Sequence, residues 1–101
     1  QPWVALDTIL SAPPGRNRVA ACLLSHIVPL LSDYEARGFV GYKQAWEALN
    51  AHANQRVDLF MGSAQTTGLV RGVNAAGALL LETDKGLEVF HGGEVSLRAV
   101  V

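Results

Sequence analysis

The hydrophobic positions of this chain repeat with a helical period in the first half and with a strand period in the second. In the first half, the apolar side chains recur at steps of three and four residues, which places them on one face of a helix. These positions are Val19, Cys22, Leu23, Ile27, Leu30, Leu31 and Tyr34. A second set predicts another helix over residues 41–51, and consists of Tyr42, Ala45, Trp46 and Leu49.

The ends of the long helix are suggested by residues with known terminal preferences. Asn17 can cap its start, and Gly38 is a good residue for ending it, with Phe39 placed to fold back on the last turn. Pro29 lies inside the pattern and should kink the helix or split it in two. Ahead of the helix, residues 13–15 read as a loop and residues 3–6 as a short strand.

After about residue 54 the period changes to two, which indicates strands. Five strands are predicted over residues 56–61, 66–73, 78–82, 87–90 and 94–99, with turns at the glycine-containing segments between them. Gly68 and Gly72 interrupt the second strand, as glycines do at the bulges and corners of tight barrels. The sequence therefore predicts an α+β fold, with a helical segment followed by a small antiparallel β-barrel.

The last predicted strand carries charge on one face. Val95 and Leu97 point one way, and Glu94, Ser96 and Arg98 point the other. At about 3.4 Å per residue, Glu94 and Arg98 are roughly 13–14 Å apart, which is too far for an ion pair. Each must interact with water, with another part of the protein or with a ligand.

Composition and charge exclude several classes of function. Half of the 101 residues are hydrophobic, 17% are charged and the net charge is −1. Basic and acidic residues are spread evenly, so no basic stripe is present to follow phosphates, and we expect no nucleic acid to bind through this segment. No apolar run approaches the roughly 20 residues that cross a bilayer, so no membrane role is expected. The single cysteine fits a reducing compartment, and we predict a cytoplasmic protein.

The residues alone indicate no catalytic or metal site. His26, His52 and His91 are widely spaced and give no metal-ligand pattern, so structural roles are favoured. Cys22 belongs to the apolar face of the helix, and a core thiol is favoured over a nucleophile. Trp3 and Trp46 are favoured as core residues over ligand platforms, although that alternative stays open. Pattern alone thus gives a helical segment and a small barrel of undetermined function.

Three motifs in order carry a family resemblance. They are Arg71–Val73 (RGV), Gly77–Glu82 (GALLLE) and Gly92–Arg98 (GGEVSLR). Together they resemble the C-terminal domain of bacterial biotin protein ligases, which is an SH3-like barrel in that family. Upstream, Gly38-Phe39, Tyr42 and Trp46-Glu47 resemble the helices that close the family's catalytic domain. The resemblance implies two domains, the end of the catalytic domain over 1–53 and the SH3-like barrel over 54–101.

The resemblance also implies a two-step reaction. Biotin and ATP, with Mg²⁺, form biotinyl-5′-AMP, and a lysine of the biotin carboxyl carrier protein of acetyl-CoA carboxylase then takes the biotin. The family's glycine- and arginine-rich phosphate loop and its principal active-site lysine segment are not found in this sequence. We therefore expect a C-terminal fragment with no catalytic residue of its own, inactive alone and without tight binding of biotin, ATP or Mg²⁺. The remainder of the catalytic domain would be its partner.

Five residues match family positions near the nucleotide or the domain boundary. Trp3 resembles the tryptophan that ends the adenylate loop and packs near the adenine. Glu94 and Arg98 resemble charged residues of the terminal strand linked to ATP use and to domain arrangement. Gly92 and Gly93 position that strand. A purely structural contact between domains is the alternative role for Glu94 and Arg98.

Two other functions remain open at this point. The chain could be a free-standing SH3-like module that binds a partner protein. Alternatively, its parent could be bifunctional, either as a ligase that also represses the biotin operon or as a ligase fused to another enzyme. The helical half resembles part of a catalytic domain, which favours the ligase over the free-standing module.

Overall fold

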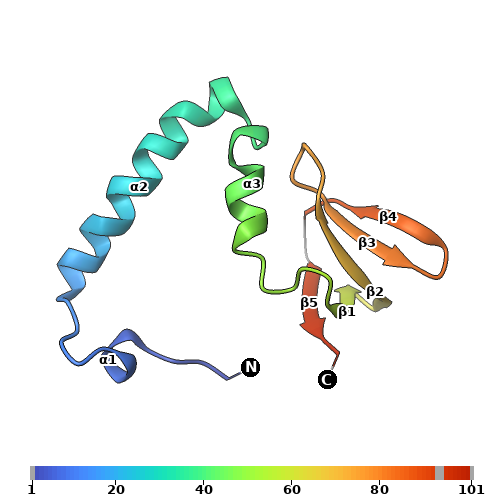
Figure 1. Ribbon diagram of the computed structural model, residues 1–101, viewed down its shortest axis with the longest axis horizontal. Helices are drawn as coiled ribbons and strands as arrows, with labels where there is room; N and C mark the ends of the chain where they lie inside the picture. The colour runs from blue at the N-terminus through green and yellow to red at the C-terminus, as the bar shows by residue number, and fades with distance from the viewer. Residues whose placement is uncertain (1, 93–94, 101) are drawn as a thin grey trace. The chain divides into compact units, whose positions relative to one another are not determined.

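The computed structural model describes residues 2–92 and 95–100, and it confirms the α+β class. Its contacts divide the chain into two compact units, Gln1–Glu35 and Ala36–Val101. Three helices come first along the chain, α1 (Leu6–Ile9), α2 (Arg16–Arg37) and α3 (Val40–Ala48) (Figure 1). The unit boundary falls near the end of α2, so α3 belongs to the same unit as the strands.

The long helix α2 is confirmed, with two differences from its predicted course. It starts at Arg16, one residue before the predicted cap Asn17, because the carbonyl of Gly15 accepts hydrogen bonds from the amides of Arg18 and Val19. It is not split, since the chain stays helical on both sides of Pro29. Gly38 ends it as predicted, with a φ of +59° that suits glycine.

The predicted strand over residues 3–6 is wrong. Ala5 is extended, but the next residue begins the short helix α1. The carbonyl of Ala5 accepts hydrogen bonds from both the amide and the hydroxyl of Thr8, which turns the chain at this point. Alternation over only four residues could not reveal this local turn.

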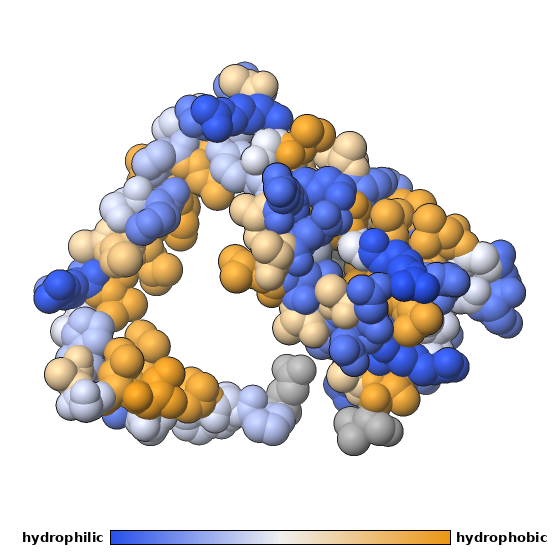
Figure 2. Space-filling view, viewed as in Figure 1, coloured by the Kyte–Doolittle hydropathy of each residue, from blue (hydrophilic) through white to orange (hydrophobic). Residues whose placement is uncertain are grey.

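The apolar faces of the helices are not buried within the chain. No residue of α1, α2 or α3 is buried, Cys22 is exposed, and Trp3 and Trp46 are 86% and 43% exposed. Within its own unit each of these three residues is exposed, so the predicted core positions of Cys22, Trp3 and Trp46 are wrong for this chain. In Figure 2, hydrophobic side chains gather where α1 meets the start of α2. Leu6 of α1 lines a groove there with Val19 and Leu23 of α2.

The second unit contains five antiparallel strands in the order β4-β3-β2-β1-β5. Their bounds are β1 (Arg56–Met61), β2 (Ala64–Val73), β3 (Leu79–Thr83), β4 (Gly86–Phe90) and β5 (Val95–Ala99). The period of two predicted all five. The bounds of β1 are as predicted and the others differ by at most two residues, while the predicted start of the last strand at residue 94 lies outside the described residues. The sheet is not closed by pairing of its edge strands β4 and β5.

The core lies on the concave side of this sheet. Its centre is formed by Val57, Leu59, Val70 and Leu81, and Leu79, Phe90 and Leu97 pack against them. Phe90 comes from one edge strand and Leu97 from the other. Because both edges contribute to one cluster, the sheet must curl around it, as in a small barrel.

Two glycines of β2 allow close packing where the strand bends. A Cβ atom on Gly68 would lie 2.6 Å from the carbonyl oxygen of Glu82 and 2.7 Å from the Leu81 side chain, so only glycine fits. Between Val70 and Val73 the pairing with β3 shifts register, and Gly72 lies in this bulge with a φ of +95°. Both interruptions were predicted as features of a bent strand.

Candidate functional site

Arg98 lies on the outer face of the sheet. Strand β5 pairs antiparallel with β1, which sets Leu97 opposite Leu59 and Arg98 opposite Asp58. Leu59 is buried in the core, so the alternation of side chains puts Arg98 on the side away from it. Arg98 is exposed. The strand register therefore presents the guanidinium to the surroundings, as the sequence predicted.

Among the described residues, Arg98 contacts an aromatic ring rather than a carboxylate. Its guanidinium carbon lies 5.5 Å from the centre of the Phe60 ring, a cation–π arrangement. The carboxylate of Asp58 already accepts a hydrogen bond of 2.5 Å from the hydroxyl of Thr67. Within residues 2–92 and 95–100, no acidic side chain forms an ion pair with Arg98. An arginine held in this way can donate to an anion from outside the sheet.

The other predicted site residues are placed only in part. Glu94 and Gly93 lie outside the described residues. Gly92 forms a bend, and a side chain there would meet open space. Trp3 is exposed in the first unit, whereas Arg98 belongs to the second, and each is described within its own unit. The predicted roles of Trp3, Glu94, Gly92 and Gly93 stay predictions.

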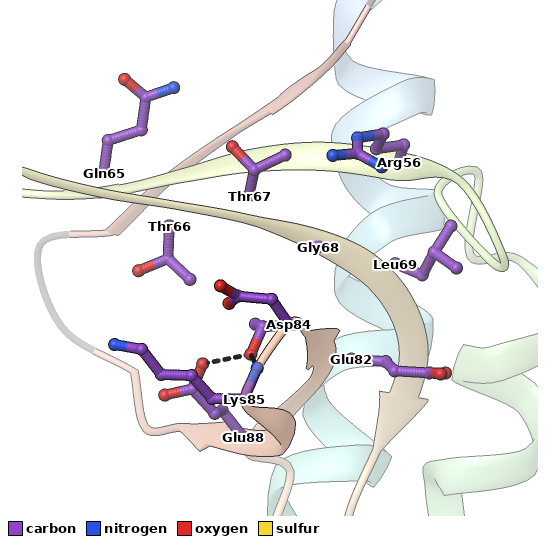
Figure 3. Close-up of a pocket in the computed structure, with 11 residues that line it drawn as sticks. Arg56, Gln65, Thr66, Thr67, Gly68, Leu69, Glu82, Asp84, Lys85 and Glu88 are labelled. Atoms are coloured by element: carbon purple, nitrogen blue, oxygen red, sulfur yellow. Dashed lines mark hydrogen bonds between the residues drawn. The ribbon is translucent and has the colours of Figure 1, made fainter.

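A polar groove of about 680 Å³ lies between the first half of β2 and the turn that joins β3 to β4. Figure 3 shows Asp84 extending from that turn toward Thr66 of β2. The turn is held by the hydroxyl of Thr83, which accepts a hydrogen bond from the Lys85 amide and donates one to Glu88. Neither Arg98 nor Trp3 lines this groove. Sequence spacing could not indicate it, because two separate hairpins form its walls.

The contact between α3 and β2 is the polar feature that sequence reasoning missed. Oε1 of Glu47 lies 2.6 Å from Nζ of Lys43, one helical turn earlier, and accepts a 3.4 Å hydrogen bond from the amide of Val73. These two donors, Lys43 first, lower the pKa of the Glu47 carboxyl below its usual value. The carboxylate thus joins the helix to the bulge of β2. The glycine at position 72 was the only sequence signal for such a site.

The described residues offer no metal site and no membrane span. No group of three or more His, Cys, Asp and Glu side chains in this part of the chain is arranged to hold a metal ion. His26 bonds through Nδ1 with the Cys22 carbonyl of its own helix, 2.8 Å away. None of the described helices has the length and apolarity needed to cross a bilayer.

Sequence comparisons identify a family and relatives. Residues 52–98 match the family model for the biotin protein ligase C-terminal domain. The "Bifunctional ligase/repressor BirA" of Escherichia coli K12 is 38% identical over 99 residues, and that of Salmonella typhimurium LT2 is 33% identical over 99 residues. Each alignment covers 98% of this chain. The chain spans only 30% and 31% of these relatives.

Solved structures show the same fold. A crystal structure of the biotin protein ligase from Aquifex aeolicus matches with a TM-score of 0.86 at 26% identity, over 94% of this chain and 42% of the ligase chain. The ligase from the same organism in complex with biotin and ATP also gives a TM-score of 0.86, over 94% of this chain and 40% of that chain. The likeness extends over helices and strands together.

Proposed function

This chain belongs to the biotin protein ligase family, and we propose that it is the C-terminal part of an enzyme that makes biotinyl-5′-AMP from biotin and ATP. The enzyme would then transfer biotin to a lysine of biotin carboxyl carrier protein. The observation that carries this proposal is the identity of 38% to a ligase through 98% of the chain. A free-standing SH3-like module would require likeness only over the strands, whereas the match includes the helices.

We assign Arg98, on the outer face of the sheet, to the ATP step. A guanidinium with available N–H groups can donate to phosphate oxygens and oppose the charge that develops on them. Arg98 has this character, and Phe60 limits the directions in which it can point. Its proposed role is to stabilise the phosphates of ATP or of the adenylate. Glu94, on the same strand, would bridge to the catalytic domain or orient the acceptor.

Mg²⁺ would accompany ATP rather than bind to this segment. The described residues contain no cluster of acidic side chains arranged to hold it. We propose that the magnesium chemistry of the reaction belongs to the nucleotide and to other parts of the ligase. The groups that carry out bond making and breaking are likewise assigned to other parts of the ligase, and the role of this chain in these steps is limited to phosphate stabilisation by Arg98.

The first unit would pack against the remainder of the catalytic domain. It exposes Leu23 and Leu31 of α2 and Trp3 ahead of α1, with exposed fractions of 57%, 65% and 86%. Each large apolar side chain gains about 1.5–3 kcal/mol when it leaves water, so this surface favours a covering partner. Trp3 would stack near the adenine, where an aromatic platform contributes about 1–3 kcal/mol.

The second step requires that water be kept from the adenylate. In that step the ε-amine of the acceptor lysine attacks the carbonyl carbon of the mixed anhydride, an amide bond forms, AMP leaves with the bonding electron pair, and the amine loses a proton. Exclusion of water prevents hydrolysis of the anhydride before the lysine arrives. We propose that the barrel domain, with its boundary near residues 53 and 54 and its terminal strand set by Gly92 and Gly93, helps to close this site. The cytoplasm is its proposed location.

A direct test uses the intact polypeptide that contains this sequence. We expect biotin-dependent exchange of labelled pyrophosphate into ATP, and transfer of biotin to the acceptor lysine of biotin carboxyl carrier protein. An acceptor in which that lysine is replaced by arginine is the matched control. Absence of both reactions in a folded, full-length protein would rule out the proposed function.

A further inference from the structure

A carboxylate of α3 forms a direct hydrogen bond to the sheet. Helix α3 has no buried residue, yet it contacts β2 at the bulge. Glu47 is 35% exposed, and its Oε1 meets the Lys43 ammonium on its own helix and the Val73 amide on β2. The second of these bonds joins residues 26 positions apart in sequence. An apolar contact lies nearby, because the ring of Phe39, just before α3, lies against Gly77 in the turn between β2 and β3. The Glu47 carboxylate adds the directional polar contact between the helix and β2.

The backbone of β2 is shaped to accept this carboxylate. Gly72 has a φ of +95°, which other residues rarely adopt, and a Cβ atom on it would lie 2.6 Å from Oε1 of Glu47. A side chain at position 72 would push the carboxylate away from Val73. Gly72 thus permits both the bulge in β2 and the contact between β2 and Glu47.

The connection between α3 and β1 is also fixed by hydrogen bonds. The amide of Asn54 donates to the Val70 carbonyl at 2.9 Å, and the Val70 amide donates to the Gln55 carbonyl at 3.0 Å. Arg71 reaches Asn54 through Nη1 and Glu82 through Nε. The segment from the helix to β1 is therefore fixed at its end by Asn54 and at its beginning by Glu47. A flexible linker has no such double attachment.

We propose that Glu47 is a positioning residue that sets the angle between α3 and the sheet. If the proposed function holds, this angle also sets how the Arg98 face is presented to the nucleotide. Strand β2 carries the Glu47 contact, β1 pairs with β2, and β5 with Arg98 pairs with β1. Because backbone hydrogen bonds join these strands, a change in the angle between α3 and β2 also changes the orientation of β5 relative to α3. No separate conformational change is needed. Glu47 itself touches neither substrate nor reacting atoms in this account.

The orientation can be measured in the 101-residue chain with two spin labels. One label replaces Gln44, exposed on α3, and the other replaces Ser63, exposed between β1 and β2, with Cys22→Ser removing the native thiol. We expect one narrow distance distribution in the parent and a broad one in Glu47→Ala. Glu47→Gln keeps an oxygen acceptor for the Val73 amide and should fall between the two. Glu35→Ala, a glutamate change on α2, is the matched control and should leave the distribution narrow.

Folding is checked in each variant by circular dichroism. If Glu47→Ala lowers the strand signal, Lys43→Met becomes the deciding variant, because it removes the ammonium from the carboxylate without altering β2. It should broaden the distribution less than Glu47→Ala does. Distributions in the folded variants that equal the parent's would overturn the proposal.

A second measurement, in the intact ligase, separates this inference from the proposed function. We expect Glu47→Ala to raise the KM for ATP about tenfold, below the roughly 100-fold that a misplacement of 1 Å can cost, with the KM for biotin unchanged. Glu47→Gln should restore part of the loss. An inactive parent enzyme would contradict the proposed function. An active parent whose ATP kinetics are unchanged by Glu47→Ala would contradict the positioning role of Glu47.

Discussion

The guanidinium carbon of Arg98 lies 5.5 Å from the centre of the Phe60 ring on the outer face of the sheet. The two residues come from paired strands, and Arg98 stands opposite Asp58, two positions from Phe60 along β1. A cation over an aromatic ring keeps hydrogen-bonding capacity, so the guanidinium can still donate N–H groups to an anionic acceptor. Through this arrangement, Arg98 on the terminal strand can bind an anion.

Phe60→Leu should weaken the ATP step of the intact ligase. An exposed cation–π contact is worth about 0.5–1 kcal/mol, so we expect the KM for ATP to rise about two- to fivefold. Steady-state kinetics of adenylation at varied ATP measure this. In an Arg98→Ala background the same substitution should have no further effect. An equal effect in both backgrounds would contradict a role of the ring through Arg98.

Gly72→Ala should destabilise the chain more than Gly86→Ala does. Both glycines have positive φ, +95° and +107°, so alanine at either position should cost about 1–2 kcal/mol of backbone strain. Only at Gly72 would the new Cβ meet Glu47, because the space around Gly86 is open. Urea unfolding of both variants measures the difference.

The double variant Gly72→Ala with Glu47→Ala tests the cause of that difference. Once alanine at position 72 has displaced the carboxylate, removing Glu47 should cost little more. Gly86→Ala and Glu47→Ala should instead add independently. Additive costs in both pairs would mean that Glu47 does not rest on Gly72.

The stability contributed by Glu47 should depend on pH. Its pKa is lowered in the folded chain, chiefly by Lys43 and then by the Val73 amide. Its contribution is therefore present above the carboxyl's ordinary value of 4.5 and is lost as pH falls through the lower folded value. The difference in unfolding free energy between the parent and Glu47→Gln should be constant near neutrality and shrink in acid.

Urea unfolding at a series of pH values provides this comparison. All other side chains are common to the two proteins, so their contributions cancel in the difference. Arg71 does not contribute to the difference, because its side chain contacts Glu82 and Asn54 rather than Glu47. A difference that grows as the pH is lowered would have the wrong sign for a carboxyl with a lowered pKa.

The 101-residue chain alone should bind neither biotin nor ATP tightly. Arg98 and Trp3 belong to separate units, and the residues that we expect to hold biotin are not found in this sequence. Isothermal titration calorimetry with each ligand should give no sub-micromolar affinity. The intact ligase, titrated in parallel, is the positive control. Tight binding by the short chain would mean that it contains a site we have not recognised.

Local patterns in the sequence predicted most of the second unit. Alternation placed Val57 and Leu59 in the core, and Gly68 and Gly72 marked the bends of β2. The start of α2 was missed because a backbone carbonyl of Gly15, rather than the Asn17 side chain, holds its first turn. Such backbone bonds leave little trace in residue types.

Long-range features were less predictable for a physical reason. Glu47 reads as an ordinary exposed helix residue, and its partner Val73 is 26 residues away. Burial was overestimated at Cys22, Trp3 and Trp46, because an apolar helix face predicts a covering partner but does not say whether this chain contains it. Arg98 was predicted on the outer face because strand alternation depends only on its neighbours.

We propose that the Arg98 face serves the ATP step of a biotin protein ligase. The most direct test is the kinetics of biotin-dependent pyrophosphate exchange in the intact enzyme with Arg98→Ala. Arg56→Ala, which removes an equal charge from the neighbouring strand β1, is the matched control. We predict that Arg98→Ala raises the KM for ATP or slows adenylation while biotin affinity stays unchanged, and that Arg56→Ala does neither. Unchanged ATP kinetics in Arg98→Ala would contradict the account and leave Arg98 a structural role only.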